Sequence, residues 1–143
     1  MSITYKGTHS TTECKGGNGG GYFSLAPELE TDPIISITIA KGWNDYVGKI
    51  KITYSNNRTV ETGRGNGNAT TLNLGPDEYI NRIDIYYSSY VEFLKITTNE
   101  GNSIETGNQY RGSKHVLLQD KRLIGFYGHS GDWLDAIGCL YED

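Results

Sequence analysis

The chain has 143 residues, the size of one domain that can bury a proper hydrophobic core. Its nineteen glycines and eleven tyrosines, with only three prolines, favour many short strands joined by tight turns rather than helices. The formal net charge of −4 without any basic stripe argues against binding to nucleic acid, and no apolar run approaches the roughly 18 residues of a membrane span.

Alternation of apolar and polar residues predicts β-strands along most of the chain. The strands predicted in this way are 35–39, 50–54, 83–87 and 94–96. Residues that tolerate tight or left-handed backbone gather between them and predict turns. These turns are 55–57, 75–77 and 99–102. Since no segment has a convincing helical period, the sequence predicts an all-β protein.

The chain also contains an internal repeat. The residues Lys-Ile-Thr at 51–53 recur 44 positions later, and in both copies Glu-Thr-Gly follows ten positions after the start. Alignment of Ile50, Leu94 and Ile137 reveals a third copy, in which a strand, a short loop and a second strand follow one another as in the first two. In the first two copies the second strand leads to a glycine-rich loop, at 63–68 and at 107–112.

The third copy stops at Asp143, before such a loop is reached. A stretch of the missing composition, residues 15–21, follows the N-terminal strand. We therefore expect three equivalent β units, the third built from both ends of the chain. Each unit needs its neighbours to bury its apolar face, and closure protects the edge strands.

Residues 128–135 hold two glycines, two carboxylates and an indole directly before the apolar run 136–141. Such a loop can offer backbone N–H groups and carboxylate oxygens together, which suits sugar hydroxyls because each is both donor and acceptor. A surface turn that closes a hairpin explains the same residues. Taken alone, the stretch favours the surface turn.

Two cysteines, Cys14 and Cys139, have neither zinc-site nor redox spacing. They are either a pair of free thiols or a disulfide, and adjoining terminal strands would favour the disulfide and a secreted, extracellular protein. The glycosylation sequons at Asn57 and Asn68 point the same way. Residues 1–5 do not form a signal peptide, so a cytoplasmic location stays open.

Gly16-Gly17-Asn18-Gly19-Gly20, together with the G-x-x-x-D loop that begins at Gly131 and runs into a strand, resembles the jacalin-related lectins. The resemblance extends over the whole chain, including its length and its three-part repeat. It implies the β-prism I fold, with three four-stranded Greek-key sheets in pseudo-threefold symmetry, as a single lectin domain over residues 1–143. It also implies one monosaccharide site where the termini meet.

The resemblance assigns roles to individual residues. Asp135 corresponds to the acid that accepts hydrogen bonds from two adjacent sugar hydroxyls, and Gly131 opens its loop. The backbone N–H groups of Asp132 and Trp133 correspond to those that meet the ring oxygen and the hydroxymethyl group. The N–H of Gly20 reaches a further hydroxyl. Such charge-assisted bonds and close backbone approach are what a carboxylate and a glycine provide.

Residues next to these have weaker assignments. Gly21 and His129 are expected at the edge of the site, and Ser89 and Tyr90 beside it. The latter two either contact a second sugar or form a solvated hairpin tip. Trp43, like most of the tyrosines, is expected in the core or on a strand face.

In this family, galactose preference accompanies cleavage that frees an amino terminus at the N-terminal glycine loop. The present chain runs unbroken from Met1 to Gly21. The resemblance therefore favours mannose or glucose, with galactose as the alternative.

The repeat also predicts how many sites exist. The residue equivalent to Asp135 is Gly48 in the first copy, which has no acceptor, and Glu92 in the second, which is longer. We therefore expect one site per protomer, so cross-linking of glycans needs a homodimer or a higher homo-oligomer. The weaker candidate pairs are Asp45 with Gly67 and Glu92 with Gly112.

Enzymatic and metal sites have little support. His9, His115 and His129 lack ligand spacing, so no metal or cofactor is expected. Asp132 and Asp135 suggest the acid pair of a glycoside hydrolase, but they are close together in one loop and would not face a glycosidic bond from opposite sides. The sequence predicts a lectin that has no catalytic residues and binds mono- and oligosaccharides or glycoproteins. Besides the hydrolase, a second alternative is a protein-interaction β domain that has lost sugar binding.

Overall fold

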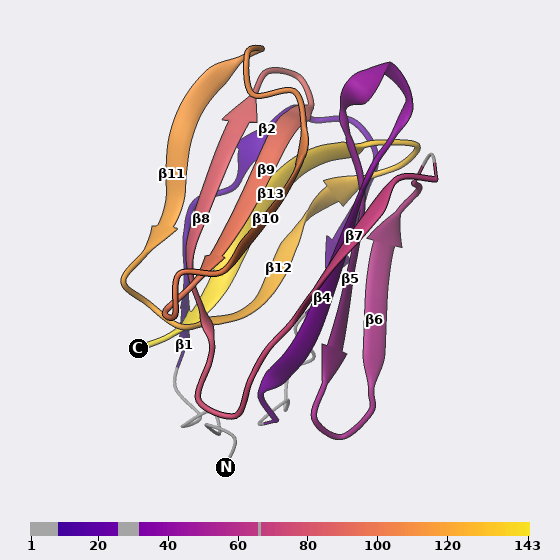
Figure 1. Cartoon of the computed structure of the whole chain (residues 1–143). Helices are drawn as coiled ribbons and strands as arrows, with labels where there is room; N and C mark the ends of the chain where they lie inside the picture. The colour runs from indigo at the N-terminus through magenta and orange to yellow at the C-terminus, as the bar shows by residue number, and fades with distance from the viewer. Residues whose placement is uncertain (1–8, 26–31, 66) are drawn as a thin grey trace.

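The computed structural model describes residues 9–25, 32–65 and 67–143 (Figure 1). The N-terminal residues 1–5 and Asn66 of the glycine-rich loop 63–68, both considered above, lie outside the described residues. Within those ranges the chain is built from β-strands, with one 3-10 turn, η1 (Trp43–Asp45), and no α-helix. No helix in this part of the chain has the length and apolar character to cross a membrane.

The strands are β1 (His9–Thr11), β2 (Lys15–Gly16), β3 (Gly21–Ser24), β4 (Ile34–Lys41), β5 (Val47–Tyr54), β6 (Thr59–Gly63), β7 (Ala69–Asn73), β8 (Ile80–Tyr87), β9 (Val91–Thr98), β10 (Ser103–Gly107), β11 (Ser113–Gln119), β12 (Leu123–Ser130) and β13 (Leu134–Glu142).

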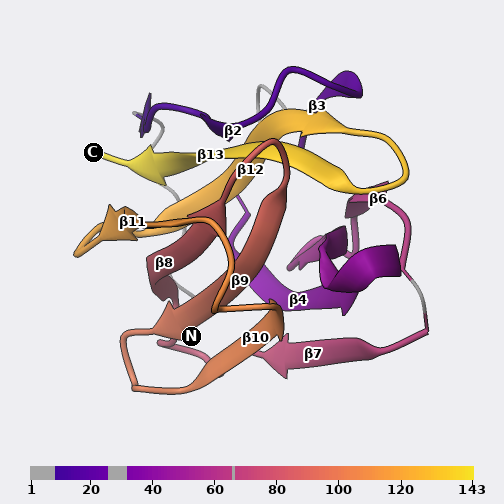
Figure 2. The same ribbon diagram turned by 90° about the horizontal axis from the view of Figure 1, so that it is seen from above.

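The strands form three antiparallel sheets that surround one core (Figure 2). Two sheets have the orders β6-β5-β4-β7 and β10-β9-β8-β11, in which the fourth strand returns to lie beside the first, as in a Greek key. In the third sheet β12 and β13 are flanked by β3 and by the short strands β1 and β2, which pair with different parts of β13 and so share one edge position. The all-β prediction, and that of a third unit made from both ends of the chain, are confirmed.

Strand register repeats from sheet to sheet. Ile50, Leu94 and Ile137, aligned from the sequence, each pair with the equivalent position of the preceding strand. Nearer the hairpin turn, the pairing in each sheet skips one residue, which makes a β-bulge. The skipped residues are Gly48, Glu92 and Asp135. The position expected to carry the sugar-binding acid is thus a bulge in all three units.

The core lies between the sheets and contains side chains of all three. Its residues come from the alternating apolar positions that predicted the strands, because period-2 alternation puts them on one face. Fully buried members include Ile37, Ile50, Ile83, Leu94, Phe126 and Ile137. The buried Tyr54 joins two sheets, since its hydroxyl lies 2.7 Å from the carbonyl oxygen of Leu25 and 2.8 Å from that of Ile124.

The expected disulfide is wrong, although the terminal strands do adjoin. Cys14 and Cys139 are both free: Cys139 is buried in the core, whereas Cys14 is exposed. Between β1 and β2 the chain leaves the regular ladder, and Thr12 exchanges hydrogen bonds of 2.9 Å with the backbone of Cys139. The two side chains therefore sit in different environments. Complete burial raises the pKa of the Cys139 thiol well above its usual range, and partial burial of the sulfur raises that of Cys14.

Candidate carbohydrate-binding site

Three hairpin turns lie at one end of the molecule, the upper end in Figure 1. We call them the first turn (residues 42–46, between β4 and β5), the second turn (88–90, between β8 and β9) and the third turn (131–133, between β12 and β13). Asp135 is the bulged residue directly after the third turn. Bulges redirect side chains, and this one leaves the Asp135 side chain at the end of the prism with 6% of the residue exposed.

The terminal glycine loop, residues 16–20, packs its backbone against Asp135. A Cβ on Gly19 would lie 2.6 Å from Oδ2 of Asp135, and one on Gly20 would lie 2.8 Å from Oδ1 and 2.6 Å from the carbonyl oxygen of Ser130. Gly20 also has a left-handed φ of +70°. The N–H of Gly17 donates to the Asp135 carbonyl oxygen at 2.9 Å. Only glycine permits this close approach. The two ends of the chain thus meet at Asp135, as the sequence predicted.

The carboxylate of Asp135 has few partners of its own. Within the described residues no hydrogen bond is made to its oxygens. Burial raises the pKa of Asp135, and the charge of the nearby His129 lowers it in part. His129 packs edge-on against Tyr22 with ring centroids 6.2 Å apart, and its Nδ1 is buried without a hydrogen-bond partner in that part of the chain.

The third turn is held tightly and leaves two donors free. The N–H of Gly131 donates to the carbonyl oxygen of Trp133 at 2.9 Å. The N–H groups of Asp132 and Trp133 make no hydrogen bond to any described residue. The side chains of these two residues point elsewhere: Asp132 pairs with Arg64 at 3.4 Å, and the Trp133 indole donates to the carbonyl oxygen of Trp43 at 2.7 Å.

The residues with weaker assignments lie around this centre. Ser89 is in the second turn, where its carbonyl oxygen would be 2.2 Å from a Cβ on Gly17, so this turn borders the terminal glycine loop. Gly21 is exposed, with open space where its Cβ would be. Trp43 is 51% exposed, which contradicts its expected place in the core or on a strand face.

Three aromatic rings close this end of the prism. Tyr46, Tyr90 and Trp133 each lie two residues before the bulge of their unit. Their ring centroids are 4.8 Å apart for Tyr46 and Tyr90, 5.1 Å for Tyr90 and Trp133, and 5.6 Å for Tyr46 and Trp133. This aromatic triad was not predicted, although the repeat alignment already placed the three residues at one position.

The three units also contact one another in a closed ring. The terminal glycine loop meets the second turn at Ser89, and Arg64 of the first glycine-rich loop meets the third turn at Asp132. Arg111 of the second glycine-rich loop donates to the carbonyl oxygen of Asn44 in the first turn at 2.6 Å. Each turn is therefore braced by the loop of a neighbouring unit.

Neither of the other bulges offers a free carboxylate. The side chain of Glu92 is 7% exposed, and its Oε1 lies 3.1 Å from Nε of Arg111. The Arg111 guanidinium also lies over the ring of Tyr46, 5.0 Å from its centroid. At Gly48 a Cβ would lie 2.1 Å from the carbonyl oxygen of Arg64, which leaves no room for any side chain.

No metal site is evident in the described ranges, where three or more His, Cys, Asp or Glu side chains nowhere gather as ligands. The chain belongs to the family of the Jacalin-like lectin domain, which matches residues 12–140. The fold, in which three antiparallel sheets surround one core, is the jacalin β-prism.

Relatives extend over most of the chain. Jacalin-related lectin 35 of Arabidopsis thaliana is 29% identical over 90% of this chain and 30% of its own length. Horcolin of Hordeum vulgare is 30% identical over 86% of this chain and 90% of its own, and the mannose/glucose-specific lectin of Parkia platycephala is 27% identical over 89% and 30%. The chain thus spans less than a third of two of these three relatives.

Solved structures share the fold. Wild-type Malaysian banana lectin superposes with a TM-score of 0.80 at 24% identity, covering 94% of this chain and 98% of that one. Artocarpin complexed with Me-α-mannose gives a TM-score of 0.77 at 21% identity, covering 94% and 97%. Since the family is one of lectins rather than enzymes, the glycoside-hydrolase interpretation of Asp132 and Asp135 is excluded.

Proposed function

We propose that the chain binds mannose- or glucose-type glycans reversibly at one site per protomer. The site residues are Gly20, Gly131, Asp132, Trp133 and Asp135. The observation that carries the proposal is the buried Asp135 carboxylate, which no described residue hydrogen-bonds and against which glycine backbone packs at distances that exclude any Cβ.

The chemistry follows from this arrangement. The carboxylate accepts two adjacent hydroxyls, and each such charge-assisted bond is about twice as strong as a neutral one. The free N–H groups of Asp132 and Trp133 are fixed by the third turn, so they donate to sugar oxygens with little loss of entropy. Each neutral hydrogen bond adds only about 1 kcal/mol net because it replaces one to water, so a single site binds with modest affinity.

Sugar preference has support of two kinds. The relative from Parkia platycephala is named for mannose and glucose, and artocarpin was solved with Me-α-mannose. Both observations point to a sugar of the mannose or glucose type.

A single site per protomer is supported by the two other bulges, because Glu92 is occupied by Arg111 and Gly48 has no acid. Cross-linking of glycans then requires further copies of the unit, as in a homodimer or a larger assembly.

Replacement of Asp135 by Asn tests the proposal. The amide keeps the shape but exchanges one acceptor for a donor and removes the charge. We expect affinity for methyl α-mannoside, measured by calorimetry, to fall about a hundredfold, because charge-assisted bonds are lost in a desolvated site. The matched control is Asp45→Asn, which alters an exposed acid of the first turn that pairs with Lys41 at 3.6 Å.

The control is expected to bind like the native protein, because a surface ion pair contributes little and Asn tolerates the left-handed φ of 64° at position 45. A native protein that binds neither mannoside nor glucoside would refute the proposal. So would an Asp135→Asn variant with undiminished affinity.

A further inference from the structure

The first turn departs from the threefold pattern. It has five residues between the paired residues Lys41 and Val47, whereas the second and third turns each have three. The extension contains η1 and carries Trp43. Since the other two turns close their hairpins with three residues, the fold itself does not need the longer one.

The extension holds an unfavourable backbone. Asn44 and Asp45 have φ values of 61° and 64°, two successive non-glycine residues in the left-handed region. Such conformations cost on the order of 1 kcal/mol each and persist where surrounding contacts hold them, often at functional sites. Those contacts include the bond from the Trp133 indole to the Trp43 carbonyl oxygen and the bond from the Gly42 N–H to the Tyr46 carbonyl oxygen, both 2.7 Å. They also include the bond of 2.6 Å from Arg111 to the Asn44 carbonyl oxygen.

This backbone holds an indole at the surface. Trp43 is 51% exposed, one of three large apolar side chains so exposed in the described residues, the others being Tyr22 and Tyr110. Its main chain is bonded to Trp133, which belongs to the third turn and hence to the sugar site. An exposed indole next to a sugar site offers a flat apolar surface on which the C–H face of a second sugar can pack.

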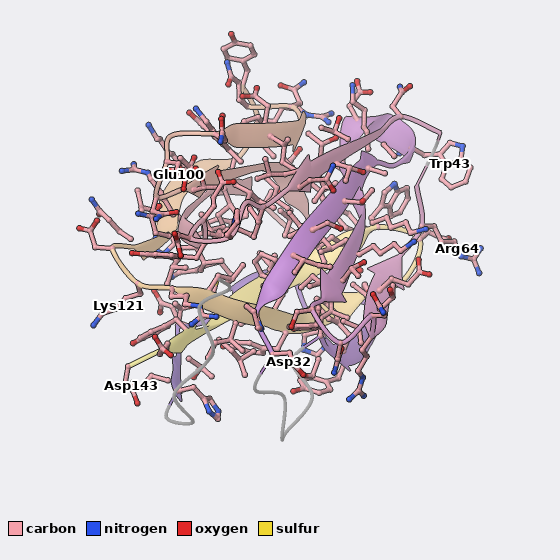
Figure 3. All side chains as sticks on the ribbon, turned by 60° about the horizontal axis from the view of Figure 1, so that its bottom comes forward. Asp32, Trp43, Arg64, Glu100, Lys121 and Asp143 are labelled. Atoms are coloured by element: carbon pink, nitrogen blue, oxygen red, sulfur yellow. The ribbon has the colours of Figure 1, made fainter. Side chains whose placement is uncertain are left out.

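Arg64 supplies polar contacts on the same side. Its side chain is 72% exposed, and only Nη1 approaches Asp132, at 3.4 Å. A guanidinium has five N–H donors, so most of those on Arg64 remain available for hydroxyls. The Arg64 carbonyl oxygen would lie 3.6 Å from a Cβ on Gly42, the residue before Trp43. Figure 3 shows Trp43 and Arg64 projecting from the same side of the molecule.

We propose that Trp43 and Arg64 form a second sugar subsite next to the Asp135 site. It takes a neutral hexose linked to the sugar bound at Asp135, so the preferred ligand is a glycan of two or more hexoses. The indole of Trp43 packs on the ring of the second hexose, and Arg64 donates to its hydroxyls. The inference rests on the proposed function, because Asp132 belongs to the first site and pairs with Arg64 in the second.

Calorimetry with two probes, methyl α-mannoside and α-linked mannotriose, tests the subsite. The measured quantity is the ratio of trisaccharide to monosaccharide affinity. We expect this ratio to exceed unity clearly in the native protein and to fall about tenfold in Trp43→Ala, the size of one lost aromatic contact. Arg64→Ala lowers it about threefold, and Trp43→Phe restores part of the loss. Tyr110→Ala, which removes a still more exposed ring from the second glycine-rich loop, leaves the ratio unchanged.

The outcomes separate the two proposals. A native protein that binds the monosaccharide and the trisaccharide equally overturns the subsite but leaves the Asp135 site intact. A ratio that is unchanged in both Trp43→Ala and Arg64→Ala also overturns the subsite and leaves the Asp135 site intact. A native protein that binds neither probe overturns the proposed function itself. Thermal unfolding of each variant verifies that it is folded, and Arg64→Ala leaves the backbone of the first turn untouched.

Discussion

Asp135 must be charged to accept two hydroxyl donors, yet it lies in a place where burial disfavours the charge. A buried carboxylate that lacks hydrogen bonds is stabilised strongly by a ligand that donates them. The raised pKa and the proposed sugar-binding role therefore have one cause, the enclosure of the bulge by the terminal glycine loop.

A pH dependence follows from that pKa. Because burial raises the pKa of Asp135 above its ordinary value of 3.8, protonation on acidification begins earlier than at an exposed aspartate. Affinity for methyl α-mannoside is expected to fall as the pH drops through this raised pKa. The free energy of unfolding of the ligand-free protein is expected to rise over the same drop in pH, because the folded state takes up the proton before the unfolded chain does.

Calorimetry between pH 7 and about pH 4 measures this effect, because an ordinary aspartate reaches only about half protonation at the lower limit. The Asp135→Asn variant serves as the reference, since its residual affinity has no such titration. Constant affinity of the native protein over the whole range would contradict the assigned role of the carboxylate.

Among the elements, the terminal glycine loop is the one whose composition the site requires. Gly20→Ala adds a Cβ that meets Ser130 and the Asp135 carboxylate, and we expect at least about a tenfold loss of sugar affinity as the loop shifts. Gly67→Ala is the matched control, since Gly67 has a similarly left-handed φ of +92° but open space around it.

The control is expected to lose about 1 kcal/mol of stability, the cost of a side chain in left-handed backbone, and to keep its affinity. Affinity titrations and urea unfolding of both variants distinguish the two effects. Equal affinities for Gly20→Ala and Gly67→Ala would show that the close packing of Gly20 is irrelevant to the site.

The sequence predicted those elements whose evidence is periodic. Alternation predicted the strands, and the alignment of Ile50, Leu94 and Ile137 predicted the register. The prediction failed for Cys14, because the stretch between β1 and β2 is irregular and strand alternation no longer tells which side chain faces the core. It failed at Trp43 because composition predicts burial for an indole, whereas the longer first turn exposes it.

The aromatic triad was missed for another reason. Equivalent positions in a repeat do not reveal that their three side chains meet. Only the closed arrangement of the sheets brings these rings together. The pairing of Arg111 with Glu92 is of the same kind, since it joins a loop and a bulge that lie 19 positions apart in the sequence.

At the scale of the whole molecule, three similar units have diverged at one position. The bulge holds no side chain at Gly48, an occupied acid at Glu92 and an available acid at Asp135. Closure of the third sheet from both ends of the chain packs the terminal glycine loop against the side chain of Asp135. The central claim is therefore that one site, made where the termini meet, binds the sugar.

A crystal structure of the protein with methyl α-mannoside tests this claim most directly. The account predicts one mannoside per chain, with two adjacent hydroxyls on the Asp135 carboxylate and other oxygens near the N–H groups of Gly20, Asp132 and Trp133. Glu92 is expected to keep its pairing with Arg111. A mannoside bound at Glu92 or on a sheet face, with Asp135 free, would contradict the account.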